Sequence, residues 1–598
     1  MSQYRAPLDD IRFVLFDVLD AEAIFAHLGK HDVSRELANA VLEEAARFSS
    51  QVLAPLNAVG DRGCSFDKQT GRVTTPEGFA AAFAQFAEGG WPGLNAPEAF
   101  GGQGMPQVLG AALKEMINAA NLAWGNFPLL SHGATEALLH HGSPWQQAVF
   151  LAPLVSGQWT GTMCLTEPQA GSDLGLLRSR AEPLPDGRYA ISGTKIFITA
   201  GEHDMAENIV HLVLARLPDA PAGSRGISLF IVPKYKVDER GQPGERNNVA
   251  CGALEHKMGI HGSATCVMNF DAAEGYLLGE PHKGLMAMFT MMNSARLGVG
   301  LQGLGLAERA LQNALRYARE RLQMRALSGA VQPDKPADAI IAHPDVRRML
   351  LTQKALVEGS RLLAYHAILM LDIAQHAPDT DAGKRADALV GFLTPIVKAC
   401  LTEWGNECTY LALQCFGGHG YIAEHGMEQL ARDARITTLY EGTTGIQALD
   451  LVGRKLLQLK GEGLQPLLQE ADAFCQAQAN NPAVAEFLPQ LQQVLGNWQQ
   501  ISQQIAQMAA ENPEEIGSTA YDYLFVCGYS LLAFWWVRAL AAAEKSAQSD
   551  AFKQGKRETA RFYYARILPR IHSHAAALSS GADTLMRLPA ENFGHSHQ

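Results

Sequence analysis

Apolar residues along the chain follow two different periods, and the change from one to the other divides the sequence. Near the N-terminus they recur at helical spacing, as at Leu8, Ile11 and Leu15, which predicts one buried face of a helix. Between about residues 158 and 278 the apolar runs become short and rich in β-branched residues, and turn residues separate them, which predicts strands. Helical spacing returns over 284–375 and 387–460.

The predicted strands are grouped together and do not alternate with helices, so a parallel nucleotide-binding sheet is not expected. A chain of 598 residues is also too long for one hydrophobic core. We therefore expect an α+β protein that is mostly α. The predicted domains are an N-terminal extension (1–34), an N-terminal helical domain (35–157), a middle β-barrel-like domain (158–278), a C-terminal four-helix-bundle domain (279–460) and an appended helical domain (461–598).

The longest apolar stretch, LFVCGYSLLAFWWV at 524–537, lies in the appended domain. It is shorter than a membrane span requires and contains Gly528. We expect a buried helix there, with a weak contact with a membrane surface as the alternative. The N-terminal residues are too acidic for a mitochondrial presequence and too interrupted for a secretory signal.

Charge and cysteine content argue against several classes of function. The chain has 49 Lys and Arg against 61 Asp and Glu, a net charge of −12, so nucleic acid is not an expected partner. Nine cysteines are scattered and form no C-x-x-C pair, which indicates neither a disulfide framework nor a structural zinc site. No metal site is predicted, and a reducing, cytoplasmic location in a bacterium is expected.

One glycine motif is misleading. GVGLQG at 298–303 matches the G-x-G-x-x-G pattern of dinucleotide-binding proteins, but that fingerprint requires a strand before it and a helix beginning within it. Here the spacing on both sides is helical. We therefore predict that these small residues allow close packing between helices.

Three other runs favour a binding site. MCLTEPQAGSDLG (163–175) ends a predicted strand and enters a turn of small residues, whose backbone can approach a large ligand closely. KIFITAGE (195–202) offers an aromatic ring and a hydroxyl. LQCFGGHGYIAEHGMEQLARDARITTLYEGTTGIQ (413–447) combines close glycines with a carboxylate, Glu441, that follows an apolar run.

These runs, in this order, resemble the acyl-CoA dehydrogenase family. The family carries Thr-Glu-Pro-x-Ala-Gly-Ser-Asp, Gln-x-x-Gly-Gly-x-Gly-Tyr/Phe, an Arg-Asp pair and Tyr/Phe-Glu-Gly-Thr, and all four occur here. The resemblance covers roughly 35–455 in a helical–β–helical arrangement. The extra residues at both ends are similar to a long bacterial branch of the family, which has an additional C-terminal helical domain.

The resemblance implies that FAD is the cofactor and that part of its site comes from a neighbouring subunit, so a homo-oligomer, most simply a dimer, is expected. Phe197 replaces the tryptophan that many members stack against the flavin. The implied cofactor-binding residues are Leu165, Thr166, Gly171, Ser172, Phe197, Thr199, Arg321, Gln323, Gln414, Gly417, Gly418 and Thr443. The implied substrate-side residues are Ser172, Asn293, Arg296 and Gly442.

Glu441 matches the family's catalytic base, which removes the proton α to the thioester while the β-hydrogen leaves as hydride to flavin N5. A carboxylate in water is a weak base, with a pKa of about 4.3. Apolar neighbours and a bound acyl chain exclude water, and this environment is expected to raise that pKa toward the working pH. The implied product is the trans-2-enoyl-CoA, and the implied electron acceptor is an electron-transfer flavoprotein.

The residues leave alternatives open. An acyl-CoA oxidase shares the fold and the glutamate but passes electrons to oxygen. A DNA-associated flavoprotein of this fold is disfavoured because residues 456–598 carry 10 basic and 13 acidic residues. The substrate also stays open, between straight-chain acyl-CoAs of fatty-acid β-oxidation and 3-methylmercaptopropionyl-CoA.

Overall fold

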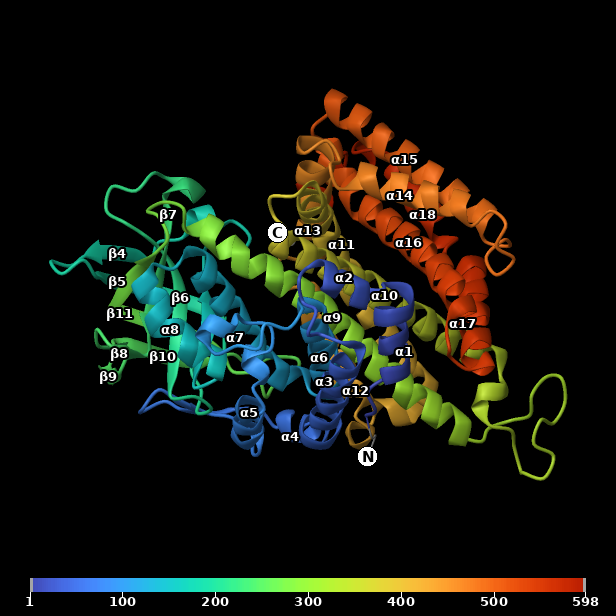
Figure 1. Cartoon of the computed structure of the whole chain (residues 1–598), viewed down its shortest axis with the longest axis horizontal. Helices are drawn as coiled ribbons and strands as arrows, with labels where there is room; N and C mark the ends of the chain where they lie inside the picture. Colours follow the sequence, from blue (N-terminus) through green and yellow to red (C-terminus); the bar gives the residue numbers. More distant parts are fainter. Residues whose placement is uncertain (1–3, 595–598) are drawn as a thin grey trace. The chain divides into compact units, whose positions relative to one another are not determined.

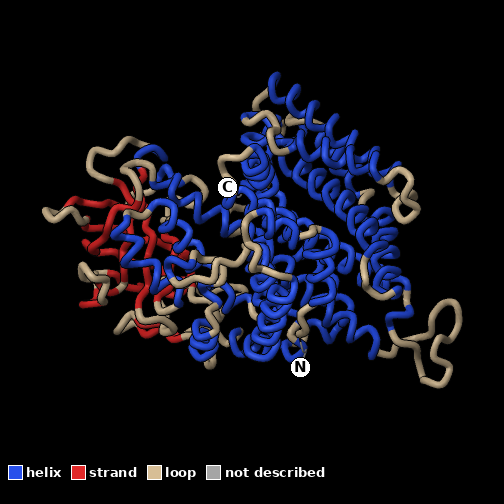
Figure 2. The backbone as a smooth tube through the Cα atoms, in the orientation of Figure 1, coloured by secondary structure: helices blue, strands red, loops and turns tan. Residues whose placement is uncertain are grey.

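The computed structural model describes residues 4–594, which form two compact units. One unit contains residues 44–298 together with 4–6, and the other contains 7–43 and 299–594. All strands lie in the first unit, and the second is built from helices and loops (Figure 2). The predicted α+β, mostly helical architecture is confirmed.

The helices of the first unit have clear local start and stop signals. Asn121 caps one helix by accepting a hydrogen bond from Trp124 N at 3.1 Å. Ser143 and Gln146 form a capping box at the start of the next helix, which ends at Gly157 in the left-handed region, with a φ of 79°. These helices are α4 (Asn57–Gly60), α5 (Phe79–Glu88), α6 (Gln107–Ala120), α7 (Leu122–His141) and α8 (Pro144–Ser156).

The strands form one main sheet of seven, in the order β10-β11-β5-β4-β6-β3. Strand β7 pairs with both β11 and β6, so β11, β5, β4, β6 and β7 close into a ring. Helix α7 packs against β3, and side chains of both elements join one buried apolar cluster. Figure 1 shows the strands grouped together. The strands are β1 (Ser65–Asp67), β2 (Arg72–Thr74), β3 (Trp159–Cys164), β4 (Arg180–Pro183), β5 (Tyr189–Thr199), β6 (Asn208–Arg216), β7 (Ile227–Pro233), β8 (Tyr235–Val237), β9 (Pro243–Arg246), β10 (Val249–Leu254) and β11 (Thr265–Leu278).

The second unit is a set of long packed helices. α9 (Gly284–Glu320) contributes residues to both units, as does α3 (Arg35–Arg47). Figure 1 shows the helices after residue 464 running alongside one another. The other helices of this unit are α1 (Leu8–Arg12), α2 (Ala21–His27), α10 (Pro344–His376), α11 (Asp381–Phe416), α12 (Met427–Arg435), α13 (Thr444–Leu449), α14 (Leu464–Ala477), α15 (Leu488–Glu511), α16 (Glu514–Lys545), α17 (Asp550–Phe562), α18 (Arg570–Leu578) and α19 (Asp583–Met586).

GVGLQG lies inside α9, and its glycines allow a close helix contact. A Cβ atom on Gly303 would lie 2.4 Å from the carbonyl oxygen of Leu401, and one on Gly405 would lie 2.7 Å from the carbonyl oxygen of Gly303. Neither position has room for a larger residue. The prediction that these residues serve helix packing is confirmed.

The apolar stretch 524–537 lies in α16, which packs against α10 and α11. Within residues 4–594, α16 is the one helix whose length and hydropathy would suit a membrane span, and 89% of its most apolar window is buried inside the chain. The prediction of a buried helix at 524–537 is confirmed.

A buried ion network joins the chain's two ends to α10. Asp10 contacts both Arg361 and Lys556. Arg361 also donates to Glu308 at 2.7 Å, and Lys556 donates to Glu358 at 2.9 Å. Burial opposes the charge on Asp10, but the two cations outweigh it and lower the pKa of Asp10 to about 2.

Candidate active site

The structure places the predicted site residues in two groups, one in each unit. Leu165, Thr166, Gly171, Ser172, Phe197, Thr199, Asn293 and Arg296 belong to the unit of residues 44–298. Arg321, Gln323, Gln414, Gly417, Gly418, Glu441, Gly442 and Thr443 belong to the other unit.

In the first group, a buried ion pair positions the loop after β3. The Lys195 ammonium donates to the Glu167 carboxylate at 2.8 Å and to the carbonyl oxygen of Leu165 at 3.0 Å. The same carboxylate accepts from the hydroxyl of Ser179 at 2.6 Å and from the backbone of Arg178 at 2.7 Å. Burial opposes its charge, but Lys195 and these hydrogen bonds lower the pKa of Glu167 to about 2.

Phe197 lies on a bulge in β5. The register between β5 and β11 shifts there, so that Ile198 faces Cys266 while Lys195 faces Met268. Phe197 has a φ of 60°, unusual for a bulky residue, and its side chain is 60% exposed. Next to it, Ile196 N donates to the carbonyl oxygen of Thr166 at 2.9 Å, which brings the two motif runs together. A strained backbone that presents an aromatic ring to solvent is typical of a ligand-binding surface.

Gly171 and Ser172 lie in an exposed turn. No atom lies within 4 Å of the position that a Cβ on Gly171 would occupy, so the backbone there is open to a ligand. Asn293 and Arg296 are three residues apart on α9, on one helix face, with Asn293 exposed and Arg296 half-buried.

In the second group, two segments meet at the ends of α9 and α11. Tyr317 stacks on Phe416 with ring centroids 4.1 Å apart, and its hydroxyl lies 2.7 Å from Nδ1 of His419. This contact brings the loop with Arg321 and Gln323 next to the turn with Gly417 and Gly418. Neither glycine has an atom within 4 Å of its Cβ position.

Asp338 holds the loop that carries Arg321 and Gln323. Its carboxylate accepts backbone hydrogen bonds from Ala326 at 2.9 Å and from Gln332 at 2.7 Å. These bonds lower the pKa of Asp338 to about 2. The loop itself exposes large apolar side chains, with Met324 75% and Leu327 92% exposed.

Glu441 lies between a short 3₁₀ turn at Ile436–Thr438 and α13, which Thr443 caps by accepting from Ile446 N at 3.2 Å. Its φ is 57°, in the left-handed region that non-glycine residues rarely adopt, and Gly442 follows with a φ of 88°. Such strain persists only where surrounding contacts fix the backbone.

Contacts around this loop come from two buried side chains, Lys398 and Gln447, and from the half-buried Tyr440. The Lys398 ammonium donates to the carbonyl oxygen of Gly442 at 2.7 Å, and Gln447 Nε2 donates to that of Glu441 at 3.0 Å. The Tyr440 hydroxyl donates to Gln302. Burial, with the charge of Glu441, raises the pKa of Tyr440 above its ordinary value, so the phenol keeps its proton.

Sequence reasoning missed Lys195, Lys398 and Gln447. A signal existed for Lys398, because it is a single charge within the apolar run FLTPIVKACL of a predicted helix. Such a position is buried, and a buried lysine needs a partner. Its partner, a carbonyl oxygen 44 residues away, follows only from the fold. Within residues 4–594, no group of three or more His, Cys, Asp or Glu side chains is arranged to hold a metal ion.

Four family models match the chain in sequence order. They are the acyl-CoA dehydrogenase N-terminal domain at 35–158, the acyl-CoA dehydrogenase middle domain at 162–273, the acyl-CoA dehydrogenase C-terminal domain at 282–457 and the acetyl-CoA dehydrogenase C-terminal-like domain at 467–589.

Two curated relatives align over the full length. The 3-methylmercaptopropionyl-CoA dehydrogenase of Ruegeria pomeroyi is 43% identical, over 98% of this chain and 99% of that protein. The broad-specificity linear acyl-CoA dehydrogenase FadE5 of Mycobacterium tuberculosis is 35% identical, over 99% of this chain and 100% of that protein.

Solved structures of acyl-CoA dehydrogenases have a fold similar to that of this chain. Butyryl-CoA dehydrogenase from Megasphaera elsdenii is 26% identical, with a TM-score of 0.56 over 70% of this chain and 98% of that chain. ACDH-11 of Caenorhabditis elegans, solved with C11-CoA, is 18% identical, with a TM-score of 0.78 over 99% of this chain and 97% of that chain, a likeness of fold.

Proposed function

The chain belongs to the acyl-CoA dehydrogenase family, and we propose that it uses FAD to oxidise a short acyl-CoA thioester to the trans-2-enoyl-CoA, with Glu441 as the base. The observation that carries this proposal is the conformation of Glu441, whose backbone has a φ of 57°. Lys398 and Gln447 hold that backbone by donating to the consecutive carbonyl oxygens of Gly442 and Glu441. A fold that maintains such strain around one carboxylate positions that carboxylate for chemistry.

Glu441 removes the α-proton, which is weakly acidic and must be reached at hydrogen-bond distance. Fixing the carboxylate in one position avoids the entropy loss of ordering it during the reaction. The half-buried loop also reduces the contact of the carboxylate with water once an acyl chain is bound. Lys398 and Gln447 do not touch substrate in this scheme and act as positioning residues.

The residues present suit FAD. Phe197 offers an exposed ring for stacking, and Gly171, Gly417 and Gly418 leave backbone open to close approach. Lys195 and Glu167 would hold the loop with Leu165 and Thr166 in place for hydrogen bonds with the cofactor. When bound, FAD supplies the acceptor for the hydride that leaves the β-carbon.

Exposed apolar residues support a homo-oligomer as part of the proposal. Met324, Leu327 and Tyr421, which is 81% exposed, belong to the same two segments as Arg321 and Gly417. Large apolar side chains gathered on a surface mark an interaction site. A second subunit that covers them would also bring its own residues to the cofactor. An electron-transfer flavoprotein is the proposed electron acceptor, since the full-length curated relatives compared above are named dehydrogenases.

The proposed substrate is based on the substrates for which two relatives are named. One is named for 3-methylmercaptopropionyl-CoA, and another, at 34% identity, is a butyryl-CoA dehydrogenase of Syntrophomonas wolfei. We propose a short acyl chain, so that the enzyme serves 3-methylmercaptopropionyl-CoA degradation or the last rounds of fatty-acid β-oxidation, in the cytoplasm.

The test is an anaerobic titration of the FAD-loaded protein with butanoyl-, octanoyl-, palmitoyl- and 3-methylthiopropanoyl-CoA. Bleaching of the visible flavin band by the short thioesters, with formation of 2-enoyl-CoA, is expected. Glu441→Gln should retain flavin and bleach at least about 10²-fold more slowly than wild type. If no thioester bleaches the wild-type flavin, the proposal is wrong. Release of hydrogen peroxide at the turnover rate in air would instead identify an oxidase.

A further inference from the structure

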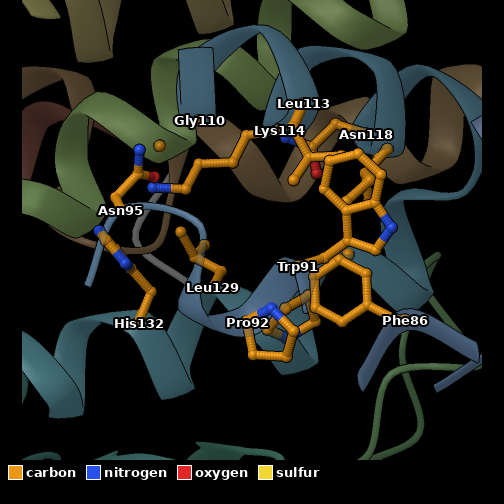
Figure 3. Close-up of a pocket in the computed structure, with 14 residues that line it drawn as sticks. Phe86, Trp91, Pro92, Asn95, Gly110, Leu113, Lys114, Asn118, Leu129 and His132 are labelled. Atoms are coloured by element: carbon orange, nitrogen blue, oxygen red, sulfur yellow. The ribbon is translucent and has the colours of Figure 1, made fainter. Parts of the chain in front are cut away.

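The cavity shown in Figure 3 and the segment around Glu441 belong to different units. Phe86, Lys114 and His132 line that cavity, and all of its lining residues come from the unit of residues 44–298. Glu441 belongs to the other unit, where α11 and α16 pack against the helix that follows it, α13. Within this unit, the position of Glu441 therefore depends on how these two helices hold α13.

The loop that carries Glu441 is attached to α11 at two points. Lys398 donates to the carbonyl oxygen of Gly442 at 2.7 Å. Five residues further along α11, the carboxylate of Glu403 accepts a hydrogen bond from the hydroxyl of Thr444 at 2.6 Å. Five residues advance an α-helix by about 7.5 Å, so the two contacts come from successive turns. Two separate attachment points restrain the direction of the segment as well as its position.

The hydrogen bond between Glu403 and Thr444 has the features of a strong one. Its length lies in the range of O–H···O⁻ bonds, which are about twice as strong as bonds between neutral groups. Thr444 is 7% exposed and Glu403 is half-buried, so the bond is partly shielded from water. Among the described residues, no cation forms an ion pair with Glu403, whereas Glu407, one turn further along α11, pairs with Arg570 at 2.7 Å. In this part of the chain, the Thr444 hydroxyl is therefore the side-chain group that stabilises the Glu403 carboxylate.

Helix α16 of the appended helical domain packs against α13 from its own side. A Cβ on Gly453, just beyond α13, would lie 3.6 Å from Cγ2 of Ile516 in α16. Burial raises the pKa of Tyr521 in α16 above its ordinary value, and the charge of Glu403 raises it further. Helix α13 is thus held by a hydrogen bond with α11 and by packing against α16, and a shift of α13 would disturb both.

We infer that Glu403 is a positioning residue for Glu441, which acts by fixing Thr444 and, through it, the first turn of α13. This inference rests on the proposed function and deepens it. Gly442 precedes Thr444 by two residues and Gly445 follows it, and because glycine is conformationally permissive, this segment needs restraint from outside. Without the bond to Glu403, the carboxylate of Glu441 would occupy a wider range of positions, which slows proton removal and leaves thioester binding unchanged.

The test is the rate at which saturating butanoyl-CoA bleaches the flavin of the FAD-loaded full-length protein, measured anaerobically by stopped flow. Thr444→Val removes the hydroxyl with little change of shape and should slow bleaching at least about fivefold. Thr444→Ser keeps the hydroxyl and should stay within about twofold of wild type. Glu403→Gln weakens the acceptor and should slow bleaching by a similar or smaller factor than Thr444→Val. In all three variants, flavin content and the half-saturating concentration of butanoyl-CoA should stay within about twofold of wild type.

The double variant shows whether the two side chains act together. Glu403→Gln combined with Thr444→Val should bleach at most about twofold more slowly than Thr444→Val alone, because the same bond is removed only once. Glu407→Gln is the matched control. It changes a carboxylate of the same helix that binds Arg570 and not the loop, so it should bleach at the wild-type rate.

Wild-type rates in both Thr444→Val and Glu403→Gln would overturn the inference, and so would single effects that multiply in the double variant. A Thr444→Ser variant as slow as Thr444→Val would also overturn it, because that result would indicate packing and not the hydrogen bond. A higher half-saturating concentration at an unchanged bleaching rate would do the same, since it would indicate a role in binding. If Glu403→Gln fails to fold, the comparison of Thr444→Val with Thr444→Ser decides by itself. If wild type is not bleached, or if Glu441→Gln bleaches at the wild-type rate, the proposed function fails and this inference fails with it.

Discussion

Replacing Asp10 with asparagine should reveal how strongly the N-terminal extension holds the second unit together. Asp10 is 9% exposed and contacts two cations that are almost fully buried, Arg361 and Lys556, at 1% and 3% side-chain exposure. The asparagine keeps the shape of the side chain and removes its charge. Glu308 and Glu358 remain as partners of the two cations.

The size of the effect follows from the pKa of Asp10. It falls from 3.8 to about 2, and each pKa unit corresponds to about 1.4 kcal/mol, so the charged form contributes about 2 kcal/mol. Breaking a buried pair by removing one partner typically costs about 3–5 kcal/mol, because charge is left uncompensated. Since each cation retains a glutamate, we expect a loss of about 2–4 kcal/mol in the free energy of unfolding at pH 7.

The stability difference between wild type and Asp10→Asn should also depend on pH. A depressed folded-state pKa means that this contribution is fully present above pH 3.8 and is lost as the pH falls through about 2. Wild type should therefore lose its advantage over Asp10→Asn between these values.

The assay is urea unfolding followed by tryptophan fluorescence, which reports on Trp535 and Trp536 in α16. Asp9→Asn, at the exposed neighbouring position, is the matched control and should be unchanged within about 0.5 kcal/mol. If Asp10→Asn is as stable as this control at pH 7, the network does not stabilise the unit and the reasoning is refuted.

Three further predictions concern the site. Glu441→Gln should lower kcat by about 10²–10⁴-fold, with flavin content and CoA-thioester affinity unchanged in absorbance and calorimetry; an active variant would exclude Glu441 as the base. Lys398→Met should lower kcat by about tenfold or more, with KM nearly unchanged in steady-state kinetics, because the loop carrying the base loses a fixed position; a change in KM alone would contradict this. Glu167→Gln should release FAD more readily than wild type on dilution, as measured by flavin fluorescence. Because the pKa of Glu167 is lowered from 4.5 to about 2, wild type should retain FAD until the pH falls toward 2. Equal release of FAD from both proteins would count against a role of this loop in holding the cofactor.

Sequence patterns predicted the features that depend on residues close together in the chain. The helical repeat around GVGLQG is visible in the sequence, and α9 follows it. The glycine runs and the Glu441 run were identified by their resemblance to the family's motifs, and the positive φ of Gly417 and Gly442 is a local conformation that glycine permits. The roles implied for these residues stay predictions, since they concern ligands.

The fold alone decided which distant groups meet. Strict alternation would put Lys195 and Phe197 on one face of β5, but the bulge between them buries one and exposes the other. Lys398 reaches the Glu441 loop only because α11 packs there. A sequence pattern indicates that a position is buried, whereas the partner it meets depends on how separate elements pack.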